Sequence, residues 1–270
     1  SLYYYYLFCR YYGGAIIAAV VRVGCPMNMI ATSNQQTAIV QAMAIFADST
    51  VNIKADAWDF ITGKKQGLKQ ALAFLGLASN KKMIGLALAI PARQTCPRGD
   101  KLAQVKKTIC SICYAMKGHD AMAPAKTAKQ RRWDLIKLAL DNDYVRALWL
   151  KAFVICMARQ THMRWHSAGD IFSAAYCALI VQACESTPHI DHWIPTKEPV
   201  ISRPLQALVN VVVRVSDDMI DQLSNKFKGP TSGCHTKTPA RGVACPAPLQ
   251  GGSCLECRAC WDHDVKHVSY

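Results

Sequence analysis

The segment HMRWHSAGD, residues 162–170, predicts the fold class of this chain. Its first residues alternate as in a β-strand, and Gly169 and Asp170 form a turn before an apolar segment with helical spacing that continues to Cys184. Asp170 is placed to cap that helix. Because residues 189–194 again have the composition of a strand, the segment predicts a strand, a turn, a helix and a second strand in succession.

The same alternation continues on both sides of this segment. Strands are expected at residues 83–90, 208–215 and 242–245, and helices at 35–45, 66–79, 125–140, 143–158 and from Asp217-Asp218 onward. This succession predicts an α/β fold in which a parallel sheet forms a complete or partial (β/α) barrel, followed by a C-terminal cysteine-rich metal loop. Functional residues of such folds gather at the carboxyl ends of the strands.

Three parts are expected along the chain. Residues 1–80 form a partly helical N-terminal extension, residues 81–244 a barrel-like domain, and residues 245–270 a cysteine-rich metal-binding tail packed on the barrel. Met27 and Met29 are candidate physiological starts, which would leave residues 1–26 outside the native chain. The apolar run at residues 15–21 is too short to span a bilayer, so no membrane partner is expected.

Positive charge is concentrated in the middle of the chain. The formal net charge is +14, and residues 98–160 contain 13 Lys or Arg against 5 Asp or Glu, whereas residues 161–270 contain 10 of each. This basic segment favours a polyanionic partner, nucleic acid first, although a solvated surface has the same composition. Hydrophobic residues make up 51% of the chain, which is typical of a globular protein and not of a disordered one.

Four cysteines near the C-terminus have the spacing of a metal site. Cys254, Cys257 and Cys260 recur every third residue, and Cys245 precedes Cys254 by nine positions. Four thiolates at this spacing can bind a [4Fe–4S] cluster or zinc. The alternative is free thiols or disulfides. A chain of 270 residues can build a core without disulfides, so we expect a reducing, cytoplasmic compartment.

A second group of cysteines, Cys96, Cys110 and Cys113, lies upstream. Three protein ligands leave one coordination position open, which distinguishes a reactive metal site from a structural one. An iron with an open position could bind a small molecule, for instance the amino and carboxylate groups of S-adenosylmethionine. The alternative is an ordinary zinc site that Cys234 or His235 completes.

Arg164, His166 and Asp170 are the predicted catalytic residues. The strand period places Arg164 and His166 on one side, and the turn brings Asp170 back to the same rim. A His there could exchange protons near neutral pH, and an Asp could bind a ribose hydroxyl or orient the His. The alternative gives Asp170 only a capping role and makes His166 a hydrogen-bonded core residue.

Four further residues are assigned to cofactor binding. Ser167 and Gly169 belong to the turn after the strand, and Lys197 and Glu198 follow the next strand between two prolines. Lys197 and Glu198 could hold an anionic group, or they could form a simple surface ion pair.

Several common motifs are missing. The chain has no GxxxxGK[ST] loop, no GxGxxG before a helix, no HExxH and no serine nucleophile elbow. ATP hydrolysis, dinucleotide-dependent dehydrogenation and zinc proteolysis therefore lack support.

Five short motifs, in this order, resemble the gene product 88 family of bacteriophages and integrated elements. They are Thr95-Cys96-Pro97, Cys110-x-x-Cys113-Tyr114-Ala115, RWHSAGDIFS at residues 164–173, Pro195-Thr196-Lys197 and Cys254-x-x-Cys257-x-x-Cys260-Trp261. The resemblance covers residues 83–268. It implies a phage setting, and hence the host-cell cytoplasm, but no established activity.

A more distant resemblance is to radical S-adenosylmethionine enzymes, which combine a parallel α/β barrel with a three-cysteine cluster and often an additional C-terminal cluster. It implies that the upstream cysteines hold a reactive [4Fe–4S] cluster and the downstream ones an auxiliary cluster. The chain departs from that pattern, because thirteen residues separate Cys96 from Cys110 instead of three and no Gly-Gly-Glu segment is present. The expected function is a radical S-adenosylmethionine-like enzyme that modifies a nucleic acid or nucleotide. The alternatives are a non-enzymatic, zinc-stabilised nucleic-acid-binding protein and an iron–sulfur redox or sensor protein.

Overall fold

The computed structural model describes residues 7–12, 15–20, 32–79, 82–222, 227–237 and 241–270. The chain divides into two compact units, Ser1–Gln36 and Thr37–Tyr270. In the first unit, β1 (Leu7–Tyr12) and β2 (Ala15–Val20) pair in antiparallel fashion. The candidate starts Met27 and Met29 lie outside the described residues.

The helices agree well with the sequence pattern. They are α1 (Ser33–Ala44), which spans the boundary between the units, α2 (Val51–Ile61), α3 (Leu68–Leu75), α4 (Pro97–Leu102), α5 (Ala123–Asp141), α6 (Asp143–Met157) and α7 (Ala174–Glu185). The predicted helices at 35–45, 66–79, 125–140 and 143–158 are confirmed. Helix α3 ends earlier than predicted because Gly76 adopts the left-handed conformation that commonly ends a helix, with φ of 66°.

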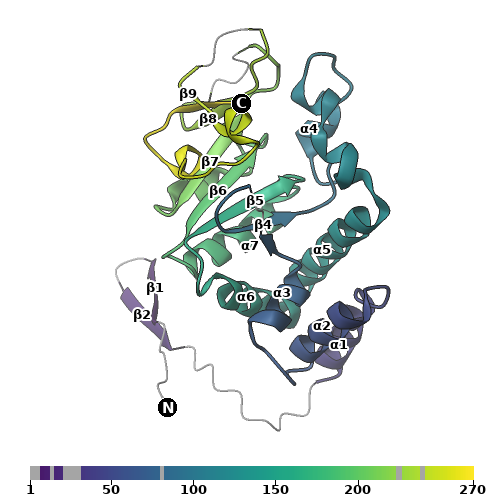
Figure 1. Ribbon diagram of the computed structural model, residues 1–270. Helices are drawn as coiled ribbons and strands as arrows, with labels where there is room; N and C mark the ends of the chain where they lie inside the picture. The colour runs from purple at the N-terminus through teal and green to yellow at the C-terminus, as the bar shows by residue number, and fades with distance from the viewer. Residues whose placement is uncertain (1–6, 13–14, 21–31, 80–81, 223–226, 238–240) are drawn as a thin grey trace. The chain divides into compact units, whose positions relative to one another are not determined.

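Eight strands of the second unit form one sheet (Figure 1). They are β3 (Ala78–Ser79), β4 (Leu86–Ala89), β5 (His162–Ala168), β6 (Asp191–Thr196), β7 (Val211–Ser216), β8 (Thr231–Gly233), β9 (Val243–Ala244) and β10 (His267–Ser269). Their order is β3-β4-β5-β6-β7-β8-β10-β9, and each pairing is parallel except that of β3 with β4.

The predicted parallel α/β sheet is thus confirmed, whereas the barrel is not. From β4 to β8 each strand pairs with the next one along the chain. In the part of the chain that the structure describes, β3 and β9 are the two edges, and no pairing joins them. The described strands form a mostly parallel sheet with two edges.

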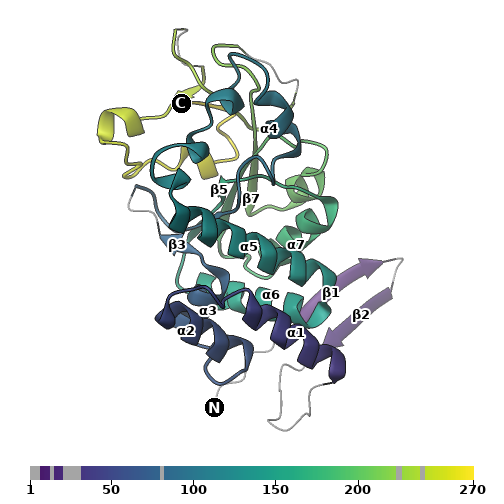
Figure 2. The same cartoon turned by 90° about the vertical axis from the view of Figure 1, so that its right-hand side faces the viewer.

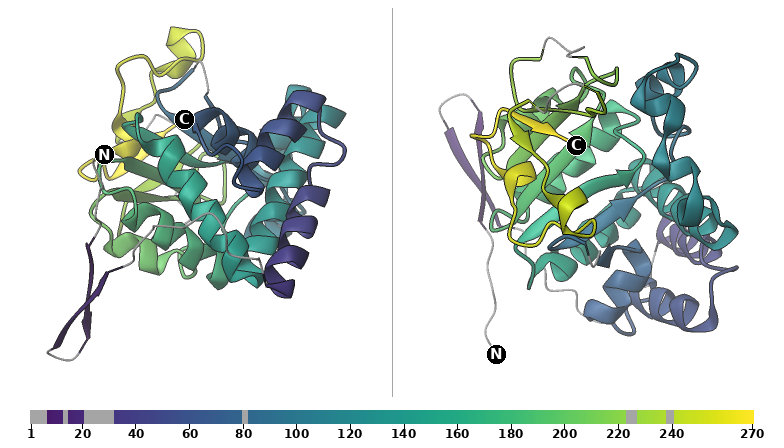
Figure 3. Two further views of the ribbon diagram at one scale, coloured as in Figure 1. Left: turned by 90° about the horizontal axis from the view of Figure 1, so that it is seen from below. Right: turned by 45° about the horizontal axis from the view of Figure 1, so that its top comes forward.

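Successive side chains of a strand point to opposite faces of the sheet, and different elements pack against the two faces. Helices α5, α6 and α7 lie on one side (Figure 2), where Trp165 of β5 stacks on Phe153 of α6 with ring centroids 5.3 Å apart. The C-terminal tail crosses the other side (Figure 3, right). There the tail residue Trp261 packs against Trp193 of β6 at 5.2 Å, and its indole donates to the Met163 carbonyl oxygen at 3.2 Å.

The turn after β7 differs from the prediction. No helix follows Asp217 and Asp218 within the described residues, although two acidic residues after a strand favour a helix start. Their backbone pairs instead with a distant loop: the Ile109 amide donates to the Asp218 carbonyl at 3.3 Å, and the Ile220 amide to that of Lys107 at 2.9 Å. Of the helices described, none is long and apolar enough for a membrane span.

Candidate functional site

Asp170 joins the ends of two neighbouring strands. Strands β5 and β6 share backbone pairing only at residues 162–164 and 191–193, so their carboxyl ends are free to separate. Asp170, which follows β5, accepts hydrogen bonds from the Thr196 hydroxyl at 2.6 Å and from the Lys197 amide at 2.8 Å, both at the end of β6. The buried carboxylate therefore replaces the missing backbone bonds and fixes the spacing of the two ends.

The predicted capping role of Asp170 is wrong. Helix α7 begins three residues later than that role requires, and its N-cap is Ser173, whose hydroxyl accepts from the Tyr176 amide at 3.1 Å. A Ser at this position satisfies one of the unpaired amides of the first turn, so no carboxylate is needed there.

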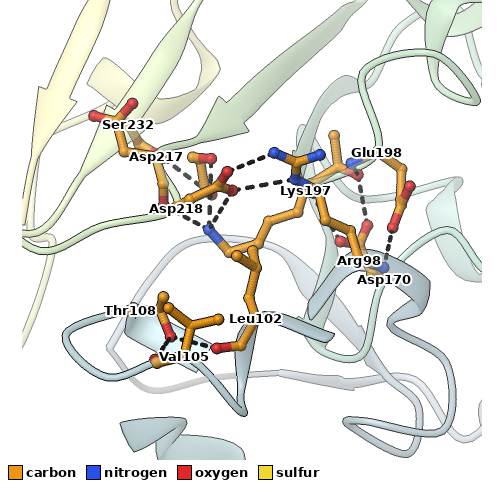
Figure 4. Close-up of polar contacts among 12 residues, drawn as sticks. Arg98, Leu102, Val105, Thr108, Asp170, Lys197, Glu198, Asp217, Asp218 and Ser232 are labelled. Atoms are coloured by element: carbon orange, nitrogen blue, oxygen red, sulfur yellow. Dashed lines mark hydrogen bonds and ion pairs between the residues drawn. The ribbon is translucent and has the colours of Figure 1, made fainter. Parts of the chain in front are cut away.

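A network of charges continues from Asp170 across the same edge of the sheet (Figure 4). Asp218 accepts from the Arg98 guanidinium at 2.5 and 3.2 Å, and its carboxylate lies 3.9 Å from the Lys197 ammonium, which donates to the Asp217 carbonyl oxygen at 2.5 Å. Glu198 accepts from the Arg98 amide at 2.6 Å. The network thus ties the start of α4 to the ends of β6 and β7.

The structure brings the three upstream cysteines together beside this network. Cys96 directly precedes α4, and Cys110 and Cys113 lie in or just after the short helix η1 (Ile109–Ile112). Burial raises the pKa of Cys96 to about 12, with further increases from Asp170 and from the other two thiols. Burial likewise raises the pKa of Cys110, which Lys197 partly offsets.

A glycine lies in close contact with two of these cysteines. A Cβ atom at Gly99 of α4 would lie 3.0 Å from Cys96 Cβ and only 3.5 Å from Cys110 Sγ. Any side chain at this position would crowd both sulfurs. A ligand or metal bound by Cys96 and Cys110 would need a residue without a side chain here.

The four downstream cysteines also form a group, on the C-terminal tail. Burial raises the pKa of Cys254 and that of Cys260, the latter to about 11, and both are raised further by Cys245. The Cys257 amide donates to the Cys254 carbonyl at 2.9 Å, which closes the turn between them. Cys260 Sγ lies 3.3 Å from the phenol oxygen of Tyr270.

No metal-binding arrangement of three or more His, Cys, Asp or Glu side chains occurs among the described residues. The thiols of each group affect one another electrostatically, yet they do not converge on one point. The soft thiol donors, with no side chain at Gly99 to crowd two of them, nevertheless fit an iron–sulfur cluster or zinc, because these bind to thiolates.

Arg164 lies between the two thiol groups. Its guanidinium stacks over the Trp193 ring at 4.7 Å and donates to the phenol oxygen of Tyr114, the residue after Cys113, at 3.5 Å. Its positive charge also lowers the pKa of Cys254 in the downstream group. Arg164 Nε is buried and has no hydrogen-bond partner among the described residues.

His166 lies on the helix side of the sheet, where it is a hydrogen-bonded core residue. The sequence allowed this interpretation as the alternative to a catalytic role. His166 has a positive φ of 52°, which breaks the strand alternation and separates its ring from Arg164. The ring nitrogen Nε2 contacts the Tyr176 hydroxyl at 3.0 Å. Burial, with a smaller effect of Arg164, lowers the His166 pKa to about 3, so the imidazole is neutral near pH 7.

Ser167 and Gly169 hold the end of β5 against its neighbours. The Ser167 hydroxyl donates to the Leu88 carbonyl at 3.2 Å, and the Ser167 carbonyl accepts from the Tyr114 hydroxyl. Gly169 has a φ of 87° and approaches Ile90 closely.

Arg214 was not anticipated as part of the site. It lies fully buried on β7, within a run of valines, and donates to the carbonyl oxygens of four residues at 2.9–3.1 Å. Three of them, Ala259, Asp262 and Val265, belong to the cysteine tail. Its charge also lowers the pKa of Cys260.

The basic segment at residues 98–160 is only partly available to a partner. Lys129 is buried and pairs with Asp120 at 2.6 Å, and Arg131 donates to the Ser49 hydroxyl at 2.8 Å. The exposed cations of the segment are Arg98, Lys101, Lys106, Lys107, Lys117, Lys126, Lys137, Lys151 and Arg159.

Asp170 predicts a pH dependence of stability. Burial raises its pKa from 3.8 to about 6, against the effect of its hydrogen bonds from Thr196 and Lys197. Because the folded-state pKa lies above the unfolded value, the stabilising contribution is complete below pH 3.8 and is lost as the pH rises through about 6. Relative to Asp170→Asn, we expect the free energy of unfolding of the parent to fall by on the order of 3 kcal/mol between about pH 4 and about pH 7.

Urea unfolding followed by tryptophan fluorescence at several pH values measures this difference. All other titrating groups are common to both proteins, so their contributions cancel. Parallel pH profiles of the parent and Asp170→Asn would contradict the prediction.

The sequence model of the family described as Gene product 88 matches residues 61–263. No curated protein and no solved structure matches the chain.

Proposed function

The chain belongs to the gene product 88 family, and we propose that it is a phage-type iron–sulfur enzyme with two cysteine-bound [4Fe–4S] clusters. In this proposal Cys96, Cys110 and Cys113 hold the reactive cluster. The second cluster is held by Cys245, Cys254, Cys257 and Cys260. The observation that carries the proposal is that seven thiols from distant parts of the sequence form two groups, in each of which neighbouring thiols raise one another's pKa.

The upstream group supports a reactive centre more than a structural one. Three cysteines leave one iron of a [4Fe–4S] cluster without a protein ligand, and Gly99 places no side chain against Cys96 and Cys110. A cluster held by these cysteines would supply the electron for reductive cleavage of bound S-adenosylmethionine. The parallel sheet, whose strands β4 to β8 pair in chain order, supports the proposal because radical S-adenosylmethionine enzymes also have a parallel α/β fold.

The protein's own side chains have three tasks in this proposal. Asp170 holds the strand ends that surround the centre, through Thr196 and Lys197. The buried ammonium of Lys197 lowers the pKa of Cys110 and so favours the thiolate that a metal needs. Arg164 lies beside both thiol groups, where a positive charge suits a carboxylate or phosphate of the cofactor or substrate.

Ser167, near the end of β5, and Gly169, in the turn that follows, remain assigned to cofactor binding. The proposed substrate is a nucleic acid or nucleotide. The exposed lysines of residues 98–160 support it, because clustered surface cations attract phosphates.

Anaerobic purification tests the proposal. A brown protein that contains iron and sulfide, and that releases 5′-deoxyadenosine from S-adenosylmethionine on reduction, would support it. Iron and sulfide without 5′-deoxyadenosine would favour an iron–sulfur redox or sensor protein. A colourless protein with stoichiometric zinc would favour the zinc-stabilised nucleic-acid-binding alternative.

We expect Cys113→Ala to remove roughly half of the iron, because one of two clusters loses a ligand while the downstream cluster keeps its four. Iron and sulfide analysis of the anaerobically isolated variant measures the effect. Cys156→Ala is the matched control: Cys156 is buried in the core of α6, away from both groups, and this variant should keep all of its iron. Full iron retention in Cys113→Ala would contradict the assignment of the upstream centre.

A further inference from the structure

A cavity lies beside the candidate site. Its volume is about 850 Å³, within the usual size range of small-molecule sites. Its walls come from β3, β4, η3 (Gly118–Ala121), α5 and the end of β5. The lining residues are Ala78, Ser79, Lys82, Ala87, Ala89, His119, Arg132 and Ser167.

The described lining of this cavity is cationic. Lys82, His119 and Arg132 are its ionisable side chains, and neither Asp nor Glu is among the described lining residues. Arg132 is the most firmly held of the three. Its Nε donates to the Gly76 carbonyl at 2.7 Å and its Nη1 to the Ala89 carbonyl at 3.0 Å.

These bonds hold the guanidinium in place without neutralising it, because both acceptors are uncharged. None of the ion pairs found among the described residues includes Arg132. Burial and the neighbouring Arg131 lower the pKa of Arg132 to about 10, which still leaves it charged at pH 7.

Gly76 helps to hold the Arg132 guanidinium in place. A Cβ atom at this left-handed residue would lie 2.8 Å from Arg132 Nε, so a glycine is needed where the guanidinium approaches the end of α3. A fixed, uncompensated guanidinium on the wall of a cavity is suited to bind an anion.

The cavity is connected to both thiol groups. The Lys82 carbonyl accepts from the Cys254 amide at 2.7 Å, which ties Lys82 to the downstream group. Ser167 is tied to the upstream group through Tyr114, whose hydroxyl donates to the Ser167 carbonyl and which directly follows Cys113. An anion bound here would bring the rest of its molecule next to the candidate centres.

We propose that this cavity binds a phosphate group of the substrate, a nucleotide or a nucleic-acid strand, through Arg132, Lys82 and His119. The inference rests on the proposed function for the identity of the substrate, but the cavity itself does not depend on a metal. The shared chemistry is a phosphate that accepts charge-assisted hydrogen bonds from a guanidinium and an ammonium.

Calorimetric titration of the full-length protein with adenosine 5′-monophosphate tests the proposal, with adenosine as the phosphate-free comparison. We expect Lys82→Gln and Arg132→Gln each to weaken binding of the monophosphate by roughly tenfold, because each removes a charged hydrogen bond. Lys137→Gln is the matched control. It removes the same charge from α5, but Lys137 is exposed, pairs with Asp134 at 2.9 Å and does not line the cavity. The affinity of Lys137→Gln for the monophosphate should stay within about twofold of that of the parent protein.

Two outcomes would overturn the proposal: adenosine binds as tightly as its monophosphate, or all three variants weaken binding equally, as a general charge effect would. If Arg132→Gln unfolds, binding of the monophosphate is measured with Lys82→Gln and His119→Gln instead, because both residues are exposed. Competition by a short single-stranded oligonucleotide, with and without a 5′-phosphate, separates a backbone phosphate from a terminal one.

Iron, sulfide and 5′-deoxyadenosine are measured on the same samples. Phosphate binding that depends on Lys82 and Arg132 in a protein without iron would support the cavity and refute the proposed cluster chemistry. An active iron–sulfur protein whose affinity for the monophosphate is unchanged by both substitutions would support the proposed cluster chemistry and refute the phosphate site in the cavity.

Discussion

We expect Arg214→Met to lower the free energy of unfolding by about 4 kcal/mol and to release the cysteine tail from the sheet. Arg214 is fully buried on β7, and its guanidinium donates to four backbone carbonyl oxygens at 2.9–3.1 Å. Methionine has a similar length but donates no hydrogen bond, so these acceptors lose their partner. Each unsatisfied buried group costs about 1–3 kcal/mol, and removal of a buried charge offsets part of the total.

Guanidinium chloride unfolding followed by tryptophan fluorescence measures the loss. The second readout is the rate at which Cys260 reacts with an alkylating reagent under native conditions, which should rise when the tail is released. Arg203→Met is the matched control, because Arg203 is exposed at the start of η4 (Arg203–Ala207) and the same change there should alter stability by less than about 0.5 kcal/mol. Equal effects of the two substitutions would contradict the anchoring role of Arg214.

The elements that the sequence predicted correctly are those with a strong local pattern. Strand β7 is a run of β-branched residues, and helices α5 and α6 have long apolar faces separated by Asn142. The Asn142 side chain accepts from the Val145 amide at 3.1 Å and so begins α6 where the sequence indicates. Periodicity and capping are local properties, which a single sequence contains.

The closure of the sheet could not be predicted in this way. Strand β10, at the end of the chain, lies between β8 and β9. It has three residues, too few for an alternation to be recognised. Whether the edges β3 and β9 pair depends on segments far apart in the chain, and no local pattern reports it.

The candidate site shows the same limit. Cysteine spacing divided the thiols into an upstream and a downstream group, and within each group the thiols affect one another electrostatically; metal binding by either group stays a prediction. The role of Asp170 was misassigned because a carboxylate before a helix looks like a cap, whereas its partners, Thr196 and Lys197, lie 26 and 27 residues away. Arg214 looked like an ordinary residue of a strand, since its acceptors lie up to 51 residues further on. Long-range hydrogen bonds of this kind leave no periodic signal.

We also expect Gly169→Ala to lower the free energy of unfolding by about 4 kcal/mol. Gly169 has a φ of 87°, a conformation that L side chains rarely adopt. A Cβ atom there would lie 2.4 Å from Ile90 Cγ1, 2.6 Å from Thr95 Oγ1 and 3.1 Å from the Ile90 carbonyl oxygen. The new methyl group must therefore displace both the segment after β4 and Thr95, the residue before Cys96.

That displacement links the fold to the site. The Thr95 hydroxyl donates to the Pro91 carbonyl at 2.8 Å and so closes the turn that positions Cys96. If Thr95 moves, Cys96 moves away from Cys110, and Gly169→Ala should lose iron from the upstream centre in addition to stability. Urea unfolding measures the stability, and iron analysis of the anaerobically isolated variant measures the centre.

Gly118→Ala separates the two causes of this effect. Gly118 also has a positive φ, 54°, but a Cβ atom there would meet nothing within 4 Å. Gly118→Ala should therefore lower the free energy of unfolding by only about 1 kcal/mol, which is the cost of a left-handed backbone at an alanine, and the variant should keep its iron. If Gly169→Ala costs no more than Gly118→Ala, backbone conformation alone explains the loss, and the close packing of Gly169 against Thr95 does not position Cys96.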